Sequence, residues 1–273
     1  MARRIRLDSE LVRRGLARSR AQAAELVTAG QVRVRGMVAT KPATMVDPAD
    51  PVVVEQRDAA EGGDQGYVSR GARKLAGALA EFTTLDVAGR RCLDAGASTG
   101  GFTEVLLRAG ATEVVAVDVG YGQLAWSLRT DPRVRVKERT NVRTLTPEDI
   151  GGRVSLTVAD LSFISLRLVL PALVTCTEPD GDLVVMVKPQ FEVGRGRVGP
   201  GGVVRDPALR AEAVAGVAET AADLGWGVAG LTASPVPGPA GNREIFLWLR
   251  RSAPPLDRAA LSAVVGDVDK VES

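Results

Sequence analysis

Cys92-Leu93-Asp94-Ala95-Gly96-Ala97-Ser98-Thr99-Gly100-Gly101-Phe102 is the stretch of sequence that decides the fold. Apolar residues typical of a buried strand precede a glycine-rich turn, and a helical pattern of apolar residues begins at Phe102 and stops at Gly110. This order predicts the first strand, turn and helix of a nucleotide-binding parallel sheet. In such a sheet the turn lets the backbone approach a ligand, and the amides at the start of the helix point toward it.

The residues of this turn distinguish between possible ligands. A dinucleotide fingerprint would have three glycines as G-x-G-x-x-G, whereas this chain has Gly96, Ser98 and Gly100 at the corresponding places. A carboxylate, Asp94, precedes the turn; it would repel a phosphate but suits the ammonium or sulfonium group of S-adenosylmethionine. Asp118 ends the next apolar run, at the distance where an acidic residue binds the ribose hydroxyls of a nucleoside. These residues favour a methyltransferase; a tight turn without a ligand is the alternative interpretation.

Apolar runs typical of strands alternate with helical patterns from this stretch to Leu249. The alternation predicts a Rossmann-like α/β fold of the class I methyltransferase type, mostly parallel, with the last strand antiparallel. Asp160, Lys188 and Glu244 lie at or within the ends of apolar strands, where ligands bind in such sheets. Burial at a strand end favours the neutral, proton-accepting form of a lysine, and nearby carboxylates oppose this effect.

Comparison of reaction types favours methylation of a ribose hydroxyl. Enzymes that methylate amino groups have an aromatic Pro-Pro motif where this chain has Asp160-Leu161-Ser162-Phe163, and neither Cys92 nor Cys176 follows a proline at a strand end, as a cytosine-attacking cysteine would. A ribose hydroxyl must instead be oriented and deprotonated, which a lysine flanked by carboxylates can do.

The composition is that of an ordinary globular protein, with 45% hydrophobic and 25% charged residues. Because the chain has no histidine, proton transfer must use Lys, Asp, Glu or Tyr. Two cysteines form neither a metal cluster nor a disulfide framework, and we find neither a secretory signal nor an apolar run as long as a membrane span. We expect a cytoplasmic protein that uses no metal.

Positive charge is concentrated at the N-terminal end. Residues 1–45 contain ten basic and three acidic residues, a local charge of +7, so the remainder of the chain carries −5. Two short helices, with Asp8 and Ser19 as expected caps, precede the alternating strand that begins at Val32, which predicts a small α+β module with a phosphate-binding face. A solvated charged face is the alternative. The candidate RNA-binding residues are Arg3, Arg4, Arg6, Arg14, Arg18, Arg20 and Lys41.

This N-terminal part resembles the RNA-binding module named after ribosomal protein S-four. The residues that match are Leu7, Leu11, Gly15-Leu16-Ala17, Ser19-Arg20, Ala23, Leu26, Gly30-Gln31-Val32-Arg33-Val34, Gly36 and Lys41-Pro42. The resemblance implies structured RNA as the partner, recognised through shape and phosphates.

The chain as a whole resembles the TlyA (haemolysin A) family of ribosomal RNA 2′-O-methyltransferases, whose catalytic half is similar to the FtsJ-type enzymes. Besides the Asp94 to Phe102 turn, the matching motifs are Val68-Ser69-Arg70-Gly71-Ala72-Arg73-Lys74-Leu75, Asp118-Val119-Gly120-Tyr121-Gly122-Gln123-Leu124, Ala159-Asp160-Leu161-Ser162-Phe163-Ile164-Ser165, Val187-Lys188-Pro189-Gln190-Phe191-Glu192 and Gly241-Asn242-Arg243-Glu244.

The resemblance implies a catalytic tetrad of Lys74, Asp160, Lys188 and Glu244. Lys188 would be the base or the hydroxyl-orienting residue, Asp160 and Glu244 would position it, and Lys74 would supply a charge on the substrate side. The expected substrate is a ribose of ribosomal RNA, a cytidine in the small or large subunit. The expected S-adenosylmethionine-binding residues are Asp94 for the ammonium, Gly96, Ser98, Thr99 and Gly100 in the turn, Asp118 for the ribose, Asn141 for the adenine, and Asp160.

The expected organisation is an RNA-binding domain at residues 1–57, a polar, glycine-rich linker at 58–66, a methyltransferase domain at 67–250 and a tail at 251–273 to which we assign no role. Two other functions stay open. A membrane-active haemolysin would need an amphipathic or spanning apolar segment, and none is visible in the sequence. A non-catalytic RNA-binding assembly factor would not need the intact tetrad.

Overall fold

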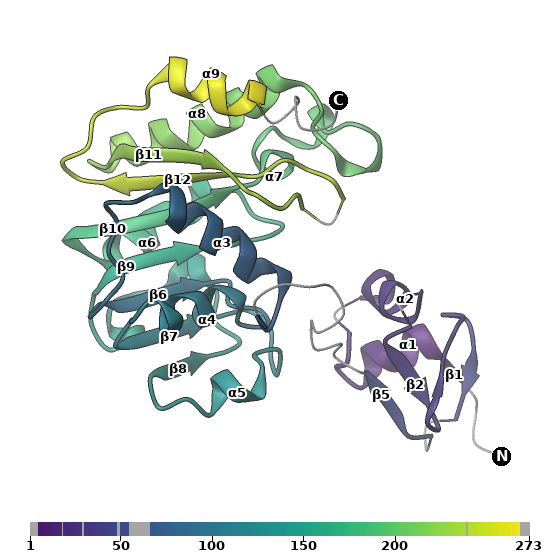
Figure 1. Cartoon of the computed structure of the whole chain (residues 1–273). Coiled ribbons are helices and arrows are strands. Elements are labelled where there is room, and N and C mark those ends of the chain that lie inside the picture. Colours follow the sequence, from purple (N-terminus) through teal and green to yellow (C-terminus); the bar gives the residue numbers. More distant parts are fainter. Residues whose placement is uncertain are drawn as a thin grey trace. The chain divides into compact units, whose positions relative to one another are not determined.

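The computed structural model describes residues 5–17, 19–28, 30–47, 50–54, 66–238 and 240–267. The chain folds as two units, residues 1–63 and 64–273, which are described one at a time (Figure 1). Residues 58–65 of the expected linker lie outside the described residues, and so do three of the candidate RNA-binding residues, Arg3, Arg4 and Arg18.

The N-terminal unit is the α+β module that the sequence predicts. Helices α1 (Leu7–Arg13) and α2 (Arg20–Thr28) pack through a small apolar core that includes Leu11, Val27 and Val32. Its strands form two antiparallel groups: β1 (Ile5–Arg6) pairs with β4 (Met45–Val46), and β2 (Val32–Val34) lies between β3 (Met37–Val38) and β5 (Val52–Val54).

The two expected helix caps of this unit differ in outcome. Ser19 caps α2 as predicted, because its hydroxyl accepts a hydrogen bond from the Gln22 amide at 3.2 Å. The predicted cap of α1 is wrong: Asp8 lies inside the helix, and its buried carboxylate binds arginine side chains instead.

The C-terminal unit is built on a sheet of seven described strands in the order β11-β12-β10-β9-β6-β7-β8 (Figure 1). The strands are β6 (Arg91–Ala95), β7 (Glu113–Val117), β8 (Val134–Lys137), β9 (Val154–Ala159), β10 (Thr177–Val187), β11 (Gly227–Ala233) and β12 (Ile245–Arg250). Strands β8, β7, β6, β9 and β10 are parallel, and β12 pairs antiparallel with β10 and β11. The predicted mostly parallel sheet with an antiparallel last strand is therefore confirmed.

Helices cover both faces of this sheet. Adjacent residues of β6 show the division, because Leu93 packs with the layer of α6 and α8 whereas Cys92 packs with the layer of α3 and α4. Side chains that alternate between two buried faces are typical of a parallel sheet inside an α/β protein. The helices are α3 (Arg70–Glu81), α4 (Gly101–Arg108), α5 (Trp126–Arg129), α6 (Leu166–Cys176), α7 (Pro189–Glu192), α8 (Pro207–Asp223) and α9 (Arg258–Asp267), with short 3₁₀ turns at Val142–Thr144, Glu148–Ile150, Arg195–Arg197 and Pro200–Gly202.

The segment that the sequence left without a role belongs to this core. Helix α9 contributes Leu261 and Val265 to the same apolar cluster as α6 and α8, and both side chains are buried. Residues 268–273 lie outside the described part of the chain.

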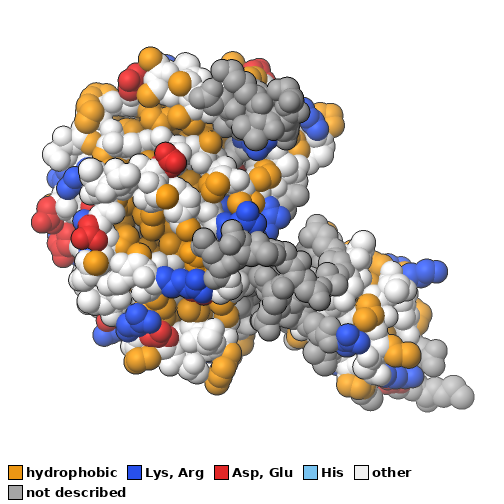
Figure 2. Space-filling model, in the orientation of Figure 1, with side chains coloured by type: hydrophobic (Ala, Val, Ile, Leu, Met, Phe, Trp, Pro, Cys, Tyr) orange, Lys and Arg blue, Asp and Glu red, His pale blue; other side chains and the backbone are white. Residues whose placement is uncertain are grey.

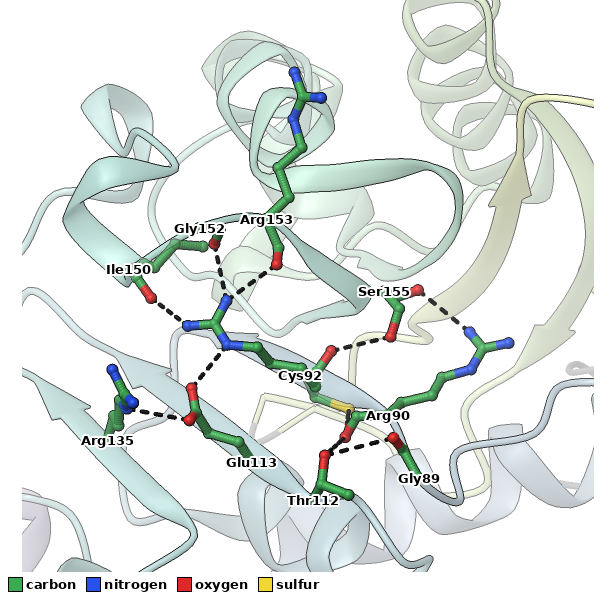
Figure 3. Close-up of polar contacts among 11 residues, drawn as sticks. Gly89, Arg90, Cys92, Thr112, Glu113, Arg135, Ile150, Gly152, Arg153 and Ser155 are labelled. Atoms are coloured by element: carbon green, nitrogen blue, oxygen red, sulfur yellow. Dashed lines mark hydrogen bonds and ion pairs between the residues drawn. The ribbon is translucent and has the colours of Figure 1, made fainter.

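An arginine network closes the amino-terminal edge of the sheet (Figure 3). Arg91, at the start of β6, donates to the backbone oxygens of Ile150, Gly152 and Arg153, and pairs with Glu113 at the start of β7. These bonds tie the starts of neighbouring strands to the turn before β9. The candidate active site lies at the opposite, carboxyl-terminal edge.

Candidate active site and RNA-binding face

The turn between β6 and α4 lies at the carboxyl-terminal edge of the sheet. Gly96 has a φ of +92°, and a Cβ there would lie 2.4 Å from the backbone oxygen of Asp160. Only glycine allows both this backbone conformation and this close approach. The Asp160 amide also donates to the Ala95 oxygen at 3.1 Å, so the turn lies directly against the start of the loop after β9.

Asp94 is enclosed beneath this turn, with none of its surface exposed. Its Oδ2 accepts a hydrogen bond from the Thr103 hydroxyl at 2.6 Å, and its Oδ1 has no partner among the described residues. Burial raises the pKa of Asp94 to about 7, the Thr103 hydrogen bond opposes this, and the charge of Asp160 adds to it. A buried carboxylate oxygen without a partner fits a cationic group such as the ammonium of S-adenosylmethionine.

A pocket lies between this turn and the ends of β7 and β8. Its lining residues are Ala97, Ser98, Ala116, Asp118, Gly120, Gln123, Leu124, Val136 and Glu138. Apolar and polar groups both line it, and these are the two kinds of contact that the base and the ribose hydroxyls of a nucleoside require.

Asp118 holds the turns that form this pocket. Its two carboxylate oxygens accept from the amides of Ser98 at 2.8 Å and Gly120 at 2.6 Å. Ser98 has a φ of +48°, which is unusual for a residue with a side chain, and the bond to Asp118 stabilises this conformation. Asp118 and Ser98, both expected from the sequence to bind the cofactor, therefore lie together.

Of the other residues expected to bind the cofactor, Thr99 and Gly100 lie in this turn and Asn141 lies outside the pocket lining. Thr99 and Gly100 belong to the same turn, where the Thr99 oxygen accepts from the Ala125 amide at 3.1 Å and Gly100, with a φ of +101°, is the N-cap of α4. Asn141 is exposed and is not among the residues that line the pocket; its Oδ1 accepts from the Arg143 amide at 3.0 Å. The geometry gives Asn141 the role of a local cap.

Lys188 follows β10 and is buried at the edge of the sheet. Its ammonium contacts Asp160 Oδ1 at 2.6 Å and donates to the hydroxyl of Ser162 at 2.8 Å. Strands β9 and β10 are parallel neighbours, so the residues that follow them come together at one edge. An ammonium group has three N–H bonds. Two of them point to the oxygens of Asp160 and Ser162, so the third can donate to a substrate oxygen.

Lys74 and Glu244 form a second buried pair. The Nζ of Lys74, on α3, lies 2.5 Å from Oε2 of Glu244, which directly precedes β12. Glu244 therefore contacts Lys74, whereas the contacts of Lys188 in the described residues are with Asp160 and the Ser162 hydroxyl. Each lysine of the tetrad has its own carboxylate.

Three partners in this region were not singled out from the sequence. Thr103 donates a hydrogen bond to Asp94, and Ser162 accepts one from Lys188. Glu192 accepts one from the Leu166 amide, at the end of the loop after β9. Ser162 and Glu192 lie within two of the matching motifs. However, no spacing pattern in the sequence indicates which residues of those motifs their side chains contact.

Neither cysteine can serve as a nucleophile, which agrees with the elimination made from sequence. Both are buried, and burial raises the pKa of Cys92 to about 12 and that of Cys176 to about 11. Within the described residues no group of three or more His, Cys, Asp or Glu side chains could hold a metal ion. In the same residues, no helix is both long and apolar enough to cross a membrane.

The described basic residues of the N-terminal unit are partly paired with its acids. Arg6 and Arg20 both bind Oδ2 of Asp8, at 2.8 and 3.1 Å, and their side chains are 46% and 60% exposed. Arg14 pairs with the buried Glu10 at 2.7 Å, and Lys41 is exposed. Lys and Arg side chains stand at several places on the visible face of this unit in Figure 2, with little Asp or Glu between them. Asp8 therefore holds two guanidinium groups side by side while both remain open to solvent.

The fold and the site define a methyltransferase domain joined to an RNA-binding type of domain. Comparison with protein families agrees: the FtsJ-like methyltransferase model matches residues 67–251, and the S4 domain model matches residues 5–52. The chain belongs to the TlyA family of FtsJ-like methyltransferases.

Relatives cover nearly the whole chain. The 16S/23S rRNA (cytidine-2′-O)-methyltransferase TlyA of Mycobacterium tuberculosis is 66% identical over 92% of this chain and 91% of its own length. A Bacillus subtilis relative whose name places it among rRNA methyltransferases is 45% identical over 89% of this chain and 85% of its own length. A solved structure from Streptococcus thermophilus, whose title names a hemolysin, is 39% identical, has a TM-score of 0.73 and covers 99% of this chain and 97% of that one. The family predicted from the sequence is confirmed.

Proposed function

We propose that this protein transfers the methyl group of S-adenosylmethionine to the 2′-hydroxyl of a cytidine ribose in ribosomal RNA of the small subunit, the large subunit or both. The observation that carries the proposal is the Lys188–Asp160 pair at 2.6 Å, which lies at the sheet edge where the glycine turn also ends. The substrate follows from the name of the relative that is 66% identical.

S-adenosylmethionine, when bound, supplies an electrophilic methyl group. Asp94 would hold its ammonium, and Asp118 with Ser98 would hold its ribose, in agreement with the uncompensated Asp94 oxygen and the lining of the pocket.

Lys188, with its partners Asp160 and Ser162, would accept the proton of the 2′-hydroxyl. The amine of Lys188 would orient the 2′-hydroxyl, and its neutral form would accept the hydroxyl proton as the oxygen–methyl bond forms and the methyl–sulfur bond of the donor breaks, leaving a neutral thioether. Asp160 then faces an ammonium at hydrogen-bond distance and stabilises the charge. Lys74, neutralised by Glu244, would present an N–H on the substrate side.

The test is methyl transfer from labelled S-adenosylmethionine to unmodified ribosomal subunits, followed by nuclease mapping of the label. Lys188→Ala is compared with Lys137→Ala, which removes an exposed lysine from the end of the parallel strand β8. We expect label on a ribose with wild type and Lys137→Ala, and loss of at least about 100-fold with Lys188→Ala while cofactor binding survives. Label on a base would contradict the ribose assignment, and full activity of Lys188→Ala would contradict the role of Lys188. No transfer with wild type would favour the assembly-factor alternative.

We propose that the N-terminal unit binds the RNA backbone through Arg6 and Arg20, which Asp8 holds together, with Arg14 and Lys41 as further contacts. Two adjacent guanidinium groups suit one phosphate or two neighbouring phosphates. Arg20→Ala is expected to weaken binding to ribosomal subunits and to reduce the slope of log K against log salt by about one. An unchanged slope would contradict this contact.

A further inference from the structure

Two segments at the edge of the sheet are joined at three successive places. Residues 160–166 follow β9 and residues 188–192 follow β10. The first contact is made by the Lys188 amine, which lies 2.6 Å from Asp160 and 2.8 Å from the Ser162 hydroxyl. The second joins the rings of Phe163 and Phe191, whose centroids are 5.3 Å apart, and the third joins Ser165 to Glu192. The mechanism above uses only the first of these contacts.

Glu192 makes the third contact with a buried carboxylate. The residue is 6% exposed, and its Oε2 accepts from the Ser165 hydroxyl at 2.6 Å while its Oε1 accepts from the Leu166 amide at 2.7 Å. The Arg167 side chain donates to the backbone oxygen of Glu192 at 2.9 Å, and its Nε lies 3.4 Å from Oε2 of the Glu192 carboxylate. One carboxylate thus fixes the point at which the loop after β9 enters α6.

The loop that Glu192 fixes is strained. Phe163 has a φ of +65°, a left-handed conformation that a bulky residue adopts only when its surroundings impose it. Its side chain is 87% exposed, so burial of the ring does not impose this conformation. Both ends of the loop are held: the Asp160 amide donates to the Ala95 oxygen at one end, and Glu192 accepts from Ser165 and Leu166 at the other. Between them Ser162 accepts from Lys188, and the Phe163 ring contacts Phe191.

We propose that Glu192 is a positioning residue whose carboxylate holds the 160–166 loop in the strained conformation that presents Asp160 and Ser162 to Lys188. The proposal rests on the proposed function, since it assigns Glu192 a role in the turnover of that site. Without the carboxylate the loop can relax at Phe163, and a displacement of about 1 Å at a reacting group can lower a rate about 100-fold.

The test compares Glu192→Ala and Glu192→Gln with a matched control, Glu212→Ala, which removes an exposed carboxylate that pairs with Arg197 on the same unit. The measurements are kcat and KM for methyl transfer to ribosomal subunits, the Kd of S-adenosylmethionine, and amide hydrogen exchange.

Glu192→Ala is expected to lower kcat about 10- to 100-fold, to leave the cofactor Kd within about twofold, and to accelerate exchange in residues 160–166. Glu192→Gln keeps an oxygen for the Leu166 amide and an N–H for the Ser165 hydroxyl, so it should restore most of the activity. Glu212→Ala should match wild type within about twofold.

The proposal is overturned if Glu192→Ala turns over within about twofold of wild type, or if its exchange rises throughout the unit and cofactor affinity falls with it. If Glu192→Ala does not fold, Ser165→Ala removes one of the two bonds and must show the same local exchange and a smaller loss of kcat. Failure of the proposed function would appear differently, as no ribose label with wild type. In that case the role of Glu192 in turnover is overturned together with the function, and acceleration of exchange confined to residues 160–166 would support only its hold on the loop.

Discussion

At pH 8, the substitution Asp94→Asn is expected to stabilise the cofactor-free protein while weakening its binding of S-adenosylmethionine. The carboxylate of Asp94 is fully buried and one of its oxygens has no partner in the described residues. Burial raises the pKa of Asp94 to about 7, so at pH 8 the folded protein contains a buried charge that it would stabilise only with a cation beside it. The neutral amide has nearly the same shape and can still accept from the Thr103 hydroxyl.

The magnitude follows from the change in pKa. A rise from 3.8 to about 7 corresponds to about 4 kcal/mol between the two protonation states, which is an upper limit on the cost of ionising Asp94 in the fold. Because the pKa of this acid is higher in the folded state, the folded protein retains the proton more strongly, and this contribution to stability falls as pH rises from about 4 to about 7. An amide N–H without an acceptor costs about 1–2 kcal/mol, so the net gain at pH 8 is about 2 kcal/mol, or 4–8 °C in Tm.

The assay is denaturant unfolding of both proteins without cofactor at pH 5 and pH 8, followed by calorimetric titration with S-adenosylmethionine. The variant should gain stability over wild type only at pH 8, and its Kd should rise at least about 100-fold because a buried ion pair is lost. A stability difference that is the same at both pH values, or a variant that is less stable at pH 8, would refute this account of Asp94. Unchanged affinity would show that Asp94 only braces its own turn.

Three further predictions test other parts of the structure. Gly96→Ala should destabilise the protein by about 1–3 kcal/mol and abolish measurable transfer, since its Cβ would lie 2.4 Å from the backbone oxygen of Asp160; unfolding and the transfer assay check both effects. Lys74→Met should cost about 3–5 kcal/mol because it leaves Glu244 buried without its partner, and the double variant with Glu244→Gln should cost less; a larger cost in the double variant would count against the pair. Glu10 has a pKa lowered to about 2 by Arg13 and Arg14, so its contribution is complete above about pH 4.5 and is lost as pH falls toward 2; Glu10→Gln should accelerate hydrogen exchange in residues 7–28 at neutral pH and abolish this acid dependence.

Much of the architecture could be predicted because it depends on local patterns. The apolar runs at residues 92–95 and 114–117 became the parallel strands β6 and β7, and Glu244 to Leu249 predicted the antiparallel β12. The C-terminal helix α9 was the exception, because the burial of Leu261 and Val265 depends on packing against α8 and β11, which the sequence pattern does not reveal.

The sequence could predict which residues belong to the candidate site, but it could not predict which of them contact one another. The sequence placed Asp160 and Lys188 at the ends of neighbouring strands, and they meet because parallel strands end at one edge. The partner of Glu244 depends instead on how α3 packs beside β12, since Lys74 lies 170 residues away in the chain. The net charge of the N-terminal module was likewise visible, whereas the burial of Asp8 between two arginines was not.

The positively charged methyl donor and the polyanionic RNA favour opposite electrostatic surroundings, and the pairing of charges differs between their proposed binding residues. A methyl donor that carries positive charge favours uncompensated carboxylates, and Asp94 and Asp118 accept only hydroxyl and amide groups in the described contacts. A polyanionic RNA would be repelled by uncompensated carboxylates, and at the tetrad each carboxylate has a lysine within 2.6 Å. Of these four acids, the two without a basic partner in the described contacts are therefore those proposed for the cofactor, and the two proposed for the ribose side are each paired with a lysine. On the proposed function, the Lys–Asp and Lys–Glu pairs would serve entry of the substrate as well as the chemistry of Lys188.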